Sequence, residues 1–147
     1  MIRRVCAAKL GEFSTQLEKQ HVIQELLPIF RQLSQDDQDS CRVLCIESLI
    51  PMARYLTKEE NRVHTLGSLL NAGEDKSWKV RLCFARNFAQ FAEAFGRDIT
   101  DNNLIQTFNQ LLSDNELEVR NAAITSLSNS LQNLGAEKIC NILLPTL

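Results

Sequence analysis

Hydrophobic residues recur along the chain in two alternating helical patterns. In both, apolar positions follow the spacing i, i+3, i+4 that places them on one face of a helix. The first pattern predicts helices, which we call outer helices, at about 22–34, 61–73, 101–113 and 138–147. The second predicts what we call inner helices at about 1–18, 39–56, 78–95 and 117–134. The two kinds alternate, so the chain is predicted to be all-α.

The two patterns superpose on a period of 39 residues. Three columns of apolar residues show it: Leu27, Leu66, Ile105 and Leu144; Phe30, Leu69, Phe108 and Leu147; Leu10, Leu49, Phe88 and Leu127. A fixed period of this length is typical of stacked repeats, in which each helix pair buries its apolar face against its neighbours. We therefore predict one α-solenoid of antiparallel helix pairs, divided into a partial repeat at 1–18, repeats at about 22–56, 61–95 and 101–134, and a partial repeat at 138–147. Because neither end carries a polar capping repeat, we expect a fragment of a longer solenoid or an incomplete gene product.

Charged residues follow the same period. The arginines are Arg3, Arg42, Arg81 and Arg120, and the acids six residues upstream of the last three are Asp36, Asp75 and Asp114. Each acid lies where an inner helix is expected to begin, which suits a helix cap and the positive end of the helix dipole. An Arg fork at this place can reach the Asp of an adjacent repeat. The spacing therefore predicts a structural ladder formed by Arg3, Arg42, Asp75, Arg81, Asp114 and Arg120.

Two further signals concern the outer helices. Thr57 and Glu60 have the spacing of a capping box, and Thr100 is predicted to cap the next outer helix. Pro28, Gly67 and Pro145 fall in one column inside the outer helices. Proline removes a helical hydrogen bond, so this column predicts a recurring kink.

Composition excludes several classes of protein. The chain is 44% hydrophobic and 23% charged, with a net charge of −2, whereas nucleic-acid binding requires a basic face. Its apolar stretches are shorter than the roughly 18 residues that a membrane span needs. Of five cysteines, Cys6 and Cys45 are 39 residues apart and are predicted to be core residues. Free thiols indicate a reducing compartment, so we expect a cytoplasmic protein, with the nucleus as the other location.

The sequence contains no recognised catalytic arrangement. His21 and His64 are out of phase with the repeat, and no metalloprotease, nucleophile-elbow or P-loop motif is present. We predict that the protein is not an enzyme and has no catalytic, cofactor-binding or metal site.

The repeat length and the Asp-x-x-x-x-Val-Arg pattern resemble the HEAT repeat. The resemblance is closest to the scaffold (A, regulatory) subunits of protein phosphatase 2A, in the N-terminal half of that family. It is carried by Arg3-Arg4 with Ala7-Ala8-Lys9-Leu10-Gly11-Glu12-Phe13, by Asp36-x-x-Asp39-Ser40-x-Arg42, and by Glu74-Asp75-Lys76-Ser77-Trp78-Lys79-Val80-Arg81. One departure is Lys79, where the family more often has Arg, so the planar fork is lost.

This resemblance implies a right-handed superhelical stack and a non-catalytic scaffold. In the family, the turns within each repeat form a ridge that holds the other subunits. A regulatory B-type subunit binds the N-terminal half, and the catalytic subunit binds C-terminal repeats that are missing from this chain. The alternative is another HEAT-repeat adaptor, such as a nuclear transport receptor or a chromosome-organising subunit, because the Val-Arg column alone is shared among such proteins.

The predicted partner-binding residues lie in the turns that precede the inner helices. Trp78 is foremost, because the period does not require an aromatic residue there and partly exposed Trp is enriched at binding hot spots. The alternative is a side chain that packs over the neighbouring turn. The full set is Arg4, Asp36, Asp37, Gln38, Lys76, Ser77, Trp78, Lys79, Asn115 and Glu116. We expect no nucleic acid or membrane as a partner.

Overall fold

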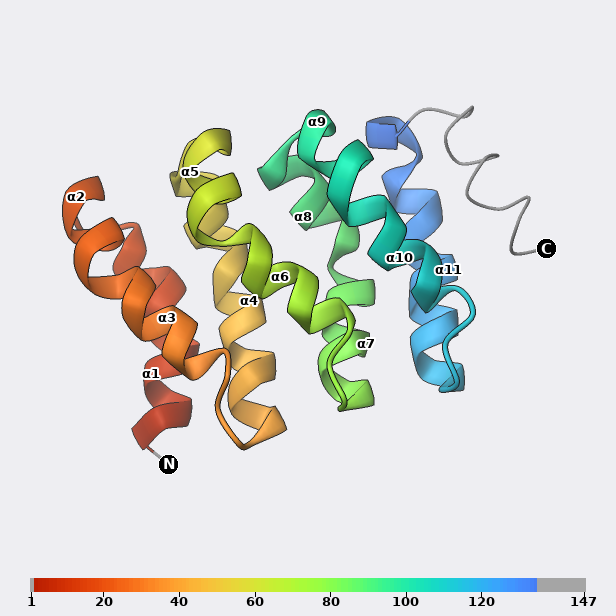
Figure 1. The fold of residues 1–147 in the computed structure, drawn as a ribbon, viewed down its shortest axis with the longest axis horizontal. Coiled ribbons are helices and arrows are strands. Elements are labelled where there is room, and N and C mark those ends of the chain that lie inside the picture. The colour runs from red at the N-terminus through yellow and green to blue at the C-terminus, as the bar shows by residue number, and fades with distance from the viewer. Residues whose placement is uncertain (1, 135–147) are drawn as a thin grey trace.

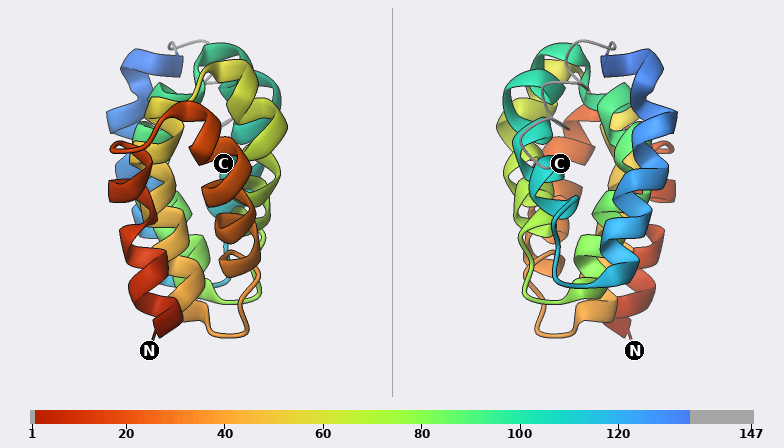
Figure 2. Two further views of the ribbon diagram at one scale, coloured as in Figure 1. Left: turned by 90° about the vertical axis from the view of Figure 1, so that its left-hand side faces the viewer. Right: turned by 90° about the vertical axis from the view of Figure 1, so that its right-hand side faces the viewer.

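The computed structural model describes residues 2–134, with side chains up to Asn129, and these residues form helices in two layers (Figure 1). The inner layer consists of α1 (Ile2–Ser14), α4 (Asp39–Tyr55), α7 (Trp78–Arg86) with α8 (Phe88–Phe95), and α11 (Leu117–Leu134). The outer layer consists of α2 (Lys19–His21), η1 (Val22–Leu26) and α3 (Leu27–Leu33); α5 (Lys58–His64) and α6 (Leu66–Gly73); and α9 (Arg97–Ile99), η2 (Thr100–Leu104) and α10 (Ile105–Leu111). Figure 2 shows the two layers edge-on. The predicted all-α solenoid is confirmed for this part of the chain, whereas the predicted helix at 138–147 lies outside the described residues.

The core lies between the two layers and follows the predicted columns. Phe30, Leu69 and Phe108 of the outer helices are fully buried, as are Leu49 and Phe88 of the inner helices. The rings of Phe88 and Phe108 stack with centroids 4.1 Å apart, which joins the inner and outer layers of neighbouring repeats. Each repeat therefore completes the core of the next one, as a solenoid requires.

Every described outer helix is interrupted at the same column. The segments η1 and η2 are both π-helical. They lie at equivalent positions, because η2 begins 78 residues, or two periods, after η1. The middle repeat instead breaks at Thr65, between α5 and α6. Pro28 lies in the first turn of α3, directly after η1, but the other two interruptions have no proline. An interruption just before the predicted column thus recurs in the described outer helices, and proline is not its general cause. Pro145 lies outside the described residues.

The helix caps agree with the sequence in one case and not in another. Thr57 and Glu60 form the predicted capping box at the start of α5. Thr100 is not a cap: it lies inside the third outer helix, which begins at Arg97, and its hydroxyl donates to the Gly96 carbonyl. Gly96, at φ 87°, ends α8 in a conformation that L side chains rarely adopt.

Neighbouring inner helices pack closely enough to exchange polar contacts. The Ser48 hydroxyl donates to the Ala7 carbonyl, and the Ser126 hydroxyl, two periods later, donates to the Ala85 carbonyl. Gly11 of α1 faces α4, where an added Cβ would lie 2.8 Å from the Ser48 carbonyl oxygen. The inner helices are thus held side by side, which aligns the turns at their N-termini. No helix in the described part of the chain has the length and apolarity of a membrane span.

Candidate partner-binding ridge and Arg–Asp ladder

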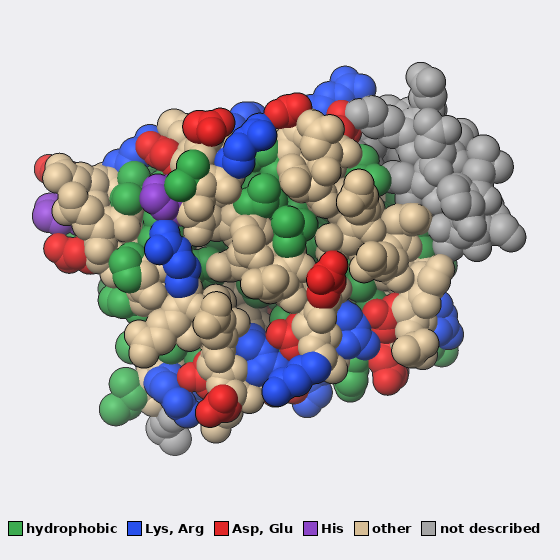
Figure 3. Space-filling model, in the orientation of Figure 1, with side chains coloured by type: hydrophobic (Ala, Val, Ile, Leu, Met, Phe, Trp, Pro, Cys, Tyr) green, Lys and Arg blue, Asp and Glu red, His purple; other side chains and the backbone are tan. Residues whose placement is uncertain are grey.

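The turns within the three described repeats lie in a row along one edge of the molecule. They connect α3 to α4, α6 to α7 and α10 to α11, and they are at the lower edge of Figure 1. On the face shown in Figure 3, Lys, Arg, Asp and Glu side chains alternate along this edge. We call this row of turns the ridge.

Arginines beneath the ridge bind the aspartate of the following repeat with both ends of the guanidinium fork. Arg42 Nε and Nη2 lie 2.9 and 3.0 Å from the two carboxylate oxygens of Asp75. Arg81 makes the same bidentate pair with Asp114, at 2.8 and 3.2 Å. These side chains are between 7 and 18% exposed, so both charge pairs are largely shielded from water.

The remaining donor of each arginine binds within its own repeat. Nη1 of Arg42 donates to the Asp36 carbonyl at 2.7 Å, and Nη1 of Arg81 donates to the Asp75 carbonyl at 2.7 Å. Arg120 repeats this bond with the Asp114 carbonyl at 2.6 Å. The six-residue spacing between Asp and Arg in the sequence therefore corresponds to a direct hydrogen bond that closes each turn.

Each aspartate also shapes the turn in which it lies. An Oδ1 atom of Asp36, Asp75 or Asp114 accepts the backbone N–H two residues later, at 2.8 to 3.0 Å. The aspartates were expected at helix caps, but the N-cap positions of α4 and α7 are Gln38 and Ser77, without side-chain caps. The carboxylates instead form Asx turns that lead into the helices.

At the N-terminal end of the row the pairing is weaker. Arg3 reaches Asp36 through one nitrogen at 3.3 Å, and the Arg3 side chain is 59% exposed. A pair of this kind contributes about 0–1 kcal/mol to stability. The ladder thus joins all three described turns, with bidentate bonds only at Arg42 and Arg81.

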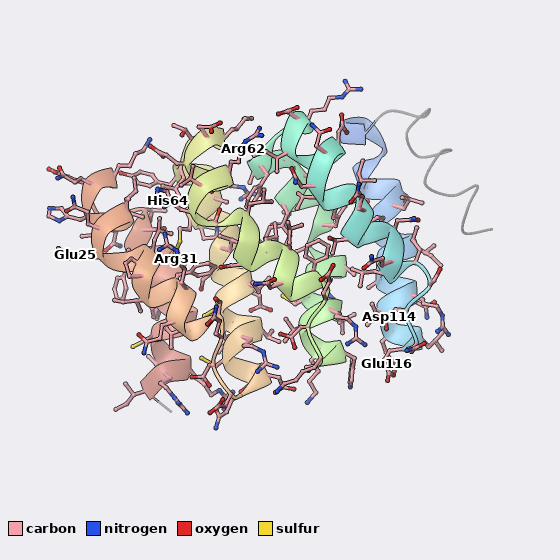
Figure 4. The ribbon with its side chains drawn as sticks, in the orientation of Figure 1. Glu25, Arg31, Arg62, His64, Asp114 and Glu116 are labelled. Atoms are coloured by element: carbon pink, nitrogen blue, oxygen red, sulfur yellow. The ribbon has the colours of Figure 1, made fainter. Side chains whose placement is uncertain are left out.

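The electrostatics of Asp114 follow from these contacts. Burial opposes the ionised form, but hydrogen bonds from Arg81 and the Glu116 N–H, together with the charges of Arg81 and Arg120, outweigh it. The pKa of the Asp114 carboxyl is therefore below its usual value. Figure 4 labels Asp114 and Glu116 in the turn before α11.

Most of the predicted partner-binding residues lie exposed on or beside the ridge. They are Arg4, Asp37, Gln38, Lys76, Lys79, Asn115 and Glu116. Asp36 differs from them, because its side chain is 6% exposed and pairs with Arg3. Its place in the structure is in the ladder.

Ser77 makes a contact that the sequence did not reveal. Its hydroxyl donates to Asp39 Oδ2 at 2.9 Å, which joins the first two turns, and this bond lowers the pKa of the Asp39 carboxyl. Asp39 was not among the predicted site residues, because its column continues as Trp78 and Leu117 and shows no repeating polar character. A contact found in one repeat leaves no periodic signal.

Trp78 begins α7 and is half-buried, with its ring packed against the hydrophobic core. The side chain therefore has a packing role. The exposed remainder lies at the ridge between Ser77 and the exposed Lys79. A Trp that is anchored on one side and open on the other suits a binding hot spot, since little conformational entropy is lost on contact.

The two histidines lie on the outer layer, away from the ladder. His64 Nδ1 is 3.0 Å from Nη2 of Arg31, and His21 Nδ1 is 3.6 Å from a Glu25 carboxylate oxygen. Figure 4 shows Arg31 and His64 on adjacent outer helices. Within residues 2–134, no group of three or more His, Cys, Asp or Glu side chains is arranged to hold a metal ion.

Comparison with known proteins gives three matches. Residues 97–147 match the family model described as PPP2R1A-like HEAT repeat. The chain is 36% identical over 97 residues to the A-type regulatory subunit of protein phosphatase PP2A from Schizosaccharomyces pombe, which covers 65% of this chain and 16% of that relative. It is 44% identical over 62 residues to a probable serine/threonine-protein phosphatase PP2A regulatory subunit of Caenorhabditis elegans. These 62 residues make up 42% of this chain and 10% of that relative. The match thus spans less than a fifth of either relative.

The two helical layers, the periodic ladder and the family match define an α-solenoid of HEAT repeats. Within that class, the chain is similar to regulatory A subunits of protein phosphatase 2A. The resemblance that the Asp-Lys-Ser-Trp segment predicts is confirmed.

Proposed function

We propose that this chain is a non-catalytic scaffold segment of a PP2A-type serine/threonine phosphatase assembly, and that its ridge binds a regulatory B-type subunit. The observation that carries the proposal is that one turn contains both residues that hold its backbone and residues that remain open to a partner. The ladder holds the backbone with Asp75 and Arg81, while Lys76, Trp78 and Lys79 of the same turn are left at the surface. The similarity to regulatory subunits of this phosphatase supports it.

The proposed mechanism is geometric. A solenoid that binds two subunits at different repeats raises the effective concentration of each near the other, without any chemistry of its own. The catalytic subunit would bind repeats outside this chain. Exposed acids on the ridge, such as Asp37 and Glu116, suit a basic partner surface and would increase its association rate.

The test is binding of purified regulatory B-type subunits to the chain, measured by surface plasmon resonance. Trp78→Ala should weaken binding by about 2 kcal/mol, roughly 30-fold, as expected of a hot spot. Val63→Ala is the control, because Val63 is 69% exposed on the outer helix α5. Thermal melting of both variants separates lost contact from lost folding.

Several outcomes would contradict the proposal. Equal binding by the wild type and a folded Trp78→Ala variant would remove Trp78 from the interface. Failure of every B-type subunit to bind the folded wild type would reject the ridge as their docking site. Tight capture of the isolated catalytic subunit by this chain would contradict the assignment of that subunit to other repeats.

A further inference from the structure

A groove is lined by side chains of the inner helices α1, α4 and α7. Figure 2 shows that one side of this inner layer faces away from the outer helices. The side chains of Val43, Leu44 and Leu82 form an apolar floor of the groove. These three residues are partly buried and pack on the core. The groove therefore lies over the edge of the core, and Arg4 and Lys79 of the predicted ridge set also border it.

The groove continues in both directions along the inner layer. A second depression, between α1 and α4, shares Leu44 and Glu47 with it. A third, between α7 and α11, shares Leu82 and Arg86 with it. The three together form a channel, which we call the inner channel, that crosses four inner helices. Its shape fits an extended segment of chain better than a compact ligand.

Cations gather in the middle of the inner channel. Arg4 of α1 and Lys79 and Arg86 of α7 all border the central groove and are exposed. Among the described residues, none of these three forms an ion pair or a side-chain hydrogen bond like those of Arg42 and Arg81 in the ladder, although the charge of Lys79 helps to lower the pKa of the Asp39 carboxyl. Glu47 is the one carboxylate in the described lining of this groove. The centre of the channel therefore carries an excess of positive charge.

The two ends of the inner channel have the opposite character. Glu12 borders the α1–α4 depression, and Glu118 borders the α7–α11 depression. A uniform polyanion would meet repulsion at both ends. The net charge of −2 also opposes binding of nucleic acid, and the lining contains no aromatic side chain on which a base could stack.

We propose that the inner channel binds an acidic, apolar-containing peptide segment of a partner protein. Carboxylates of the peptide lie against Arg4, Lys79 and Arg86, and its apolar side chains cover Val43 and Leu82. Charge complementarity determines where the peptide lies, and burial of the floor adds affinity. Arg4 and Lys79 also belong to the predicted partner-binding set of the ridge, so the inner channel meets the ridge at these two residues. Arg86 lies more than one helical turn further along α7 than the ridge residues and belongs to the channel alone.

The probe is a fluorescent synthetic peptide of Glu and Leu residues, titrated with the purified chain and followed by anisotropy. A peptide with Lys in place of Glu tests charge, and one with Ser in place of Leu tests the apolar floor. Arg86→Glu should weaken binding of the Glu–Leu peptide at least ~10-fold, which corresponds to about 1.4 kcal/mol. Arg54→Glu is the matched control, because Arg54 is exposed on α4 and does not line the channel. Binding of the Glu–Leu peptide should also weaken as salt is raised.

The proposal would be overturned by equal binding of the Lys-containing peptide, or by equal effects of the two arginine variants while both remain folded by circular dichroism. It would also be overturned if single-stranded DNA or phosphatidylserine vesicles bound as tightly as the peptide and with the same dependence on Arg86. Binding of regulatory subunits to the ridge should be unaffected by Arg86→Glu, and peptide binding should be unaffected by Trp78→Ala. Failure of one site is therefore distinguishable from failure of the other.

Discussion

At the scale of single residues, the aspartates of the ridge each satisfy three groups. The Asp75 carboxylate binds the Arg42 fork and the Ser77 N–H, and its carbonyl accepts from Arg81. Asp114 repeats this set with Arg81, Glu116 and Arg120. One short acidic side chain thus shapes its turn and joins two repeats, and its arginine partner is satisfied at all three nitrogens.

Loss of one ladder arginine should weaken the coupling between repeats. Arg81→Ala removes the bidentate pair with Asp114 and leaves that carboxylate, 8% exposed, without its fork. Breaking a largely buried pair costs about 3–5 kcal/mol. Arg3→Ala is the control and should cost under about 1 kcal/mol, because the Arg3 side chain is 59% exposed. Urea denaturation measures both, and equal effects would contradict the importance of burial.

At the scale of helices, two inner helices pack closely at a glycine, and the described outer helices are interrupted at one column. The inner helices α1 and α4 approach so closely that Gly11 has no room for a side chain. The outer helices instead break at one column in each described repeat, and Gly67, just after one such break, has open space around it. Gly11 therefore has a packing role, whereas Gly67 has none that the structure shows.

Two glycine substitutions should have opposite effects. Gly11→Ala brings a Cβ within 2.5 Å of the Pro51 ring and 2.8 Å of the Ser48 carbonyl, and the overpacking should cost about 1–3 kcal/mol. Gly67→Ala adds a helix-favouring residue in free space and should stabilise the protein by about 0.5–1 kcal/mol. Thermal unfolding compares the two, and a stabilising Gly11→Ala would show that α1 and α4 can separate without cost.

At the scale of the whole molecule, the environment of a repeat position depends on its neighbours. Phe13, Met52 and Phe91 occupy the same column. Met52 and Phe91 are fully buried, whereas Phe13 is 47% exposed on α1, at the N-terminal end of the stack. Ile124 of α11 is likewise 59% exposed, although Ile46 and Ala85 of its column are buried. Cys6, predicted to be a core residue, is exposed too, whereas Cys45 of its column is buried. A position of one column can therefore be buried in one repeat and exposed in another.

This dependence predicts unequal effects at equivalent positions. Phe91→Ala removes a fully buried ring that neighbours Phe84 and should cost about 3–5 kcal/mol. Phe13→Ala removes a half-exposed ring and should cost far less. Guanidinium denaturation of the two variants checks the difference. Equal losses would mean that the exposed face of α1 is covered in solution, for example by a second copy of the chain.

The repeat was predictable because its signals are periodic. Apolar columns predicted the two layers, and Arg and Asp at fixed spacing predicted the partners of the ladder. A contact that occurs in one repeat alone, such as the hydrogen bond between Ser77 and Asp39, leaves no periodic signal and was not predictable. Thr100 was assigned as a cap because its type suits one, but Gly96 allows the helix to begin earlier and leaves Thr100 inside it.

The sequence by itself determined the all-α class, the 39-residue period and the residues of the ladder other than Asp36, because each recurs at fixed spacing and a local helix aligns them. Only the tertiary structure decided which surface each polar side chain faces. Asp36 is drawn into the ladder, Trp78 is half covered by the core, and Arg86 is left unpaired in the inner channel. These outcomes depend on contacts between repeats, and residues that vary from one repeat to the next carry no periodic record of such contacts.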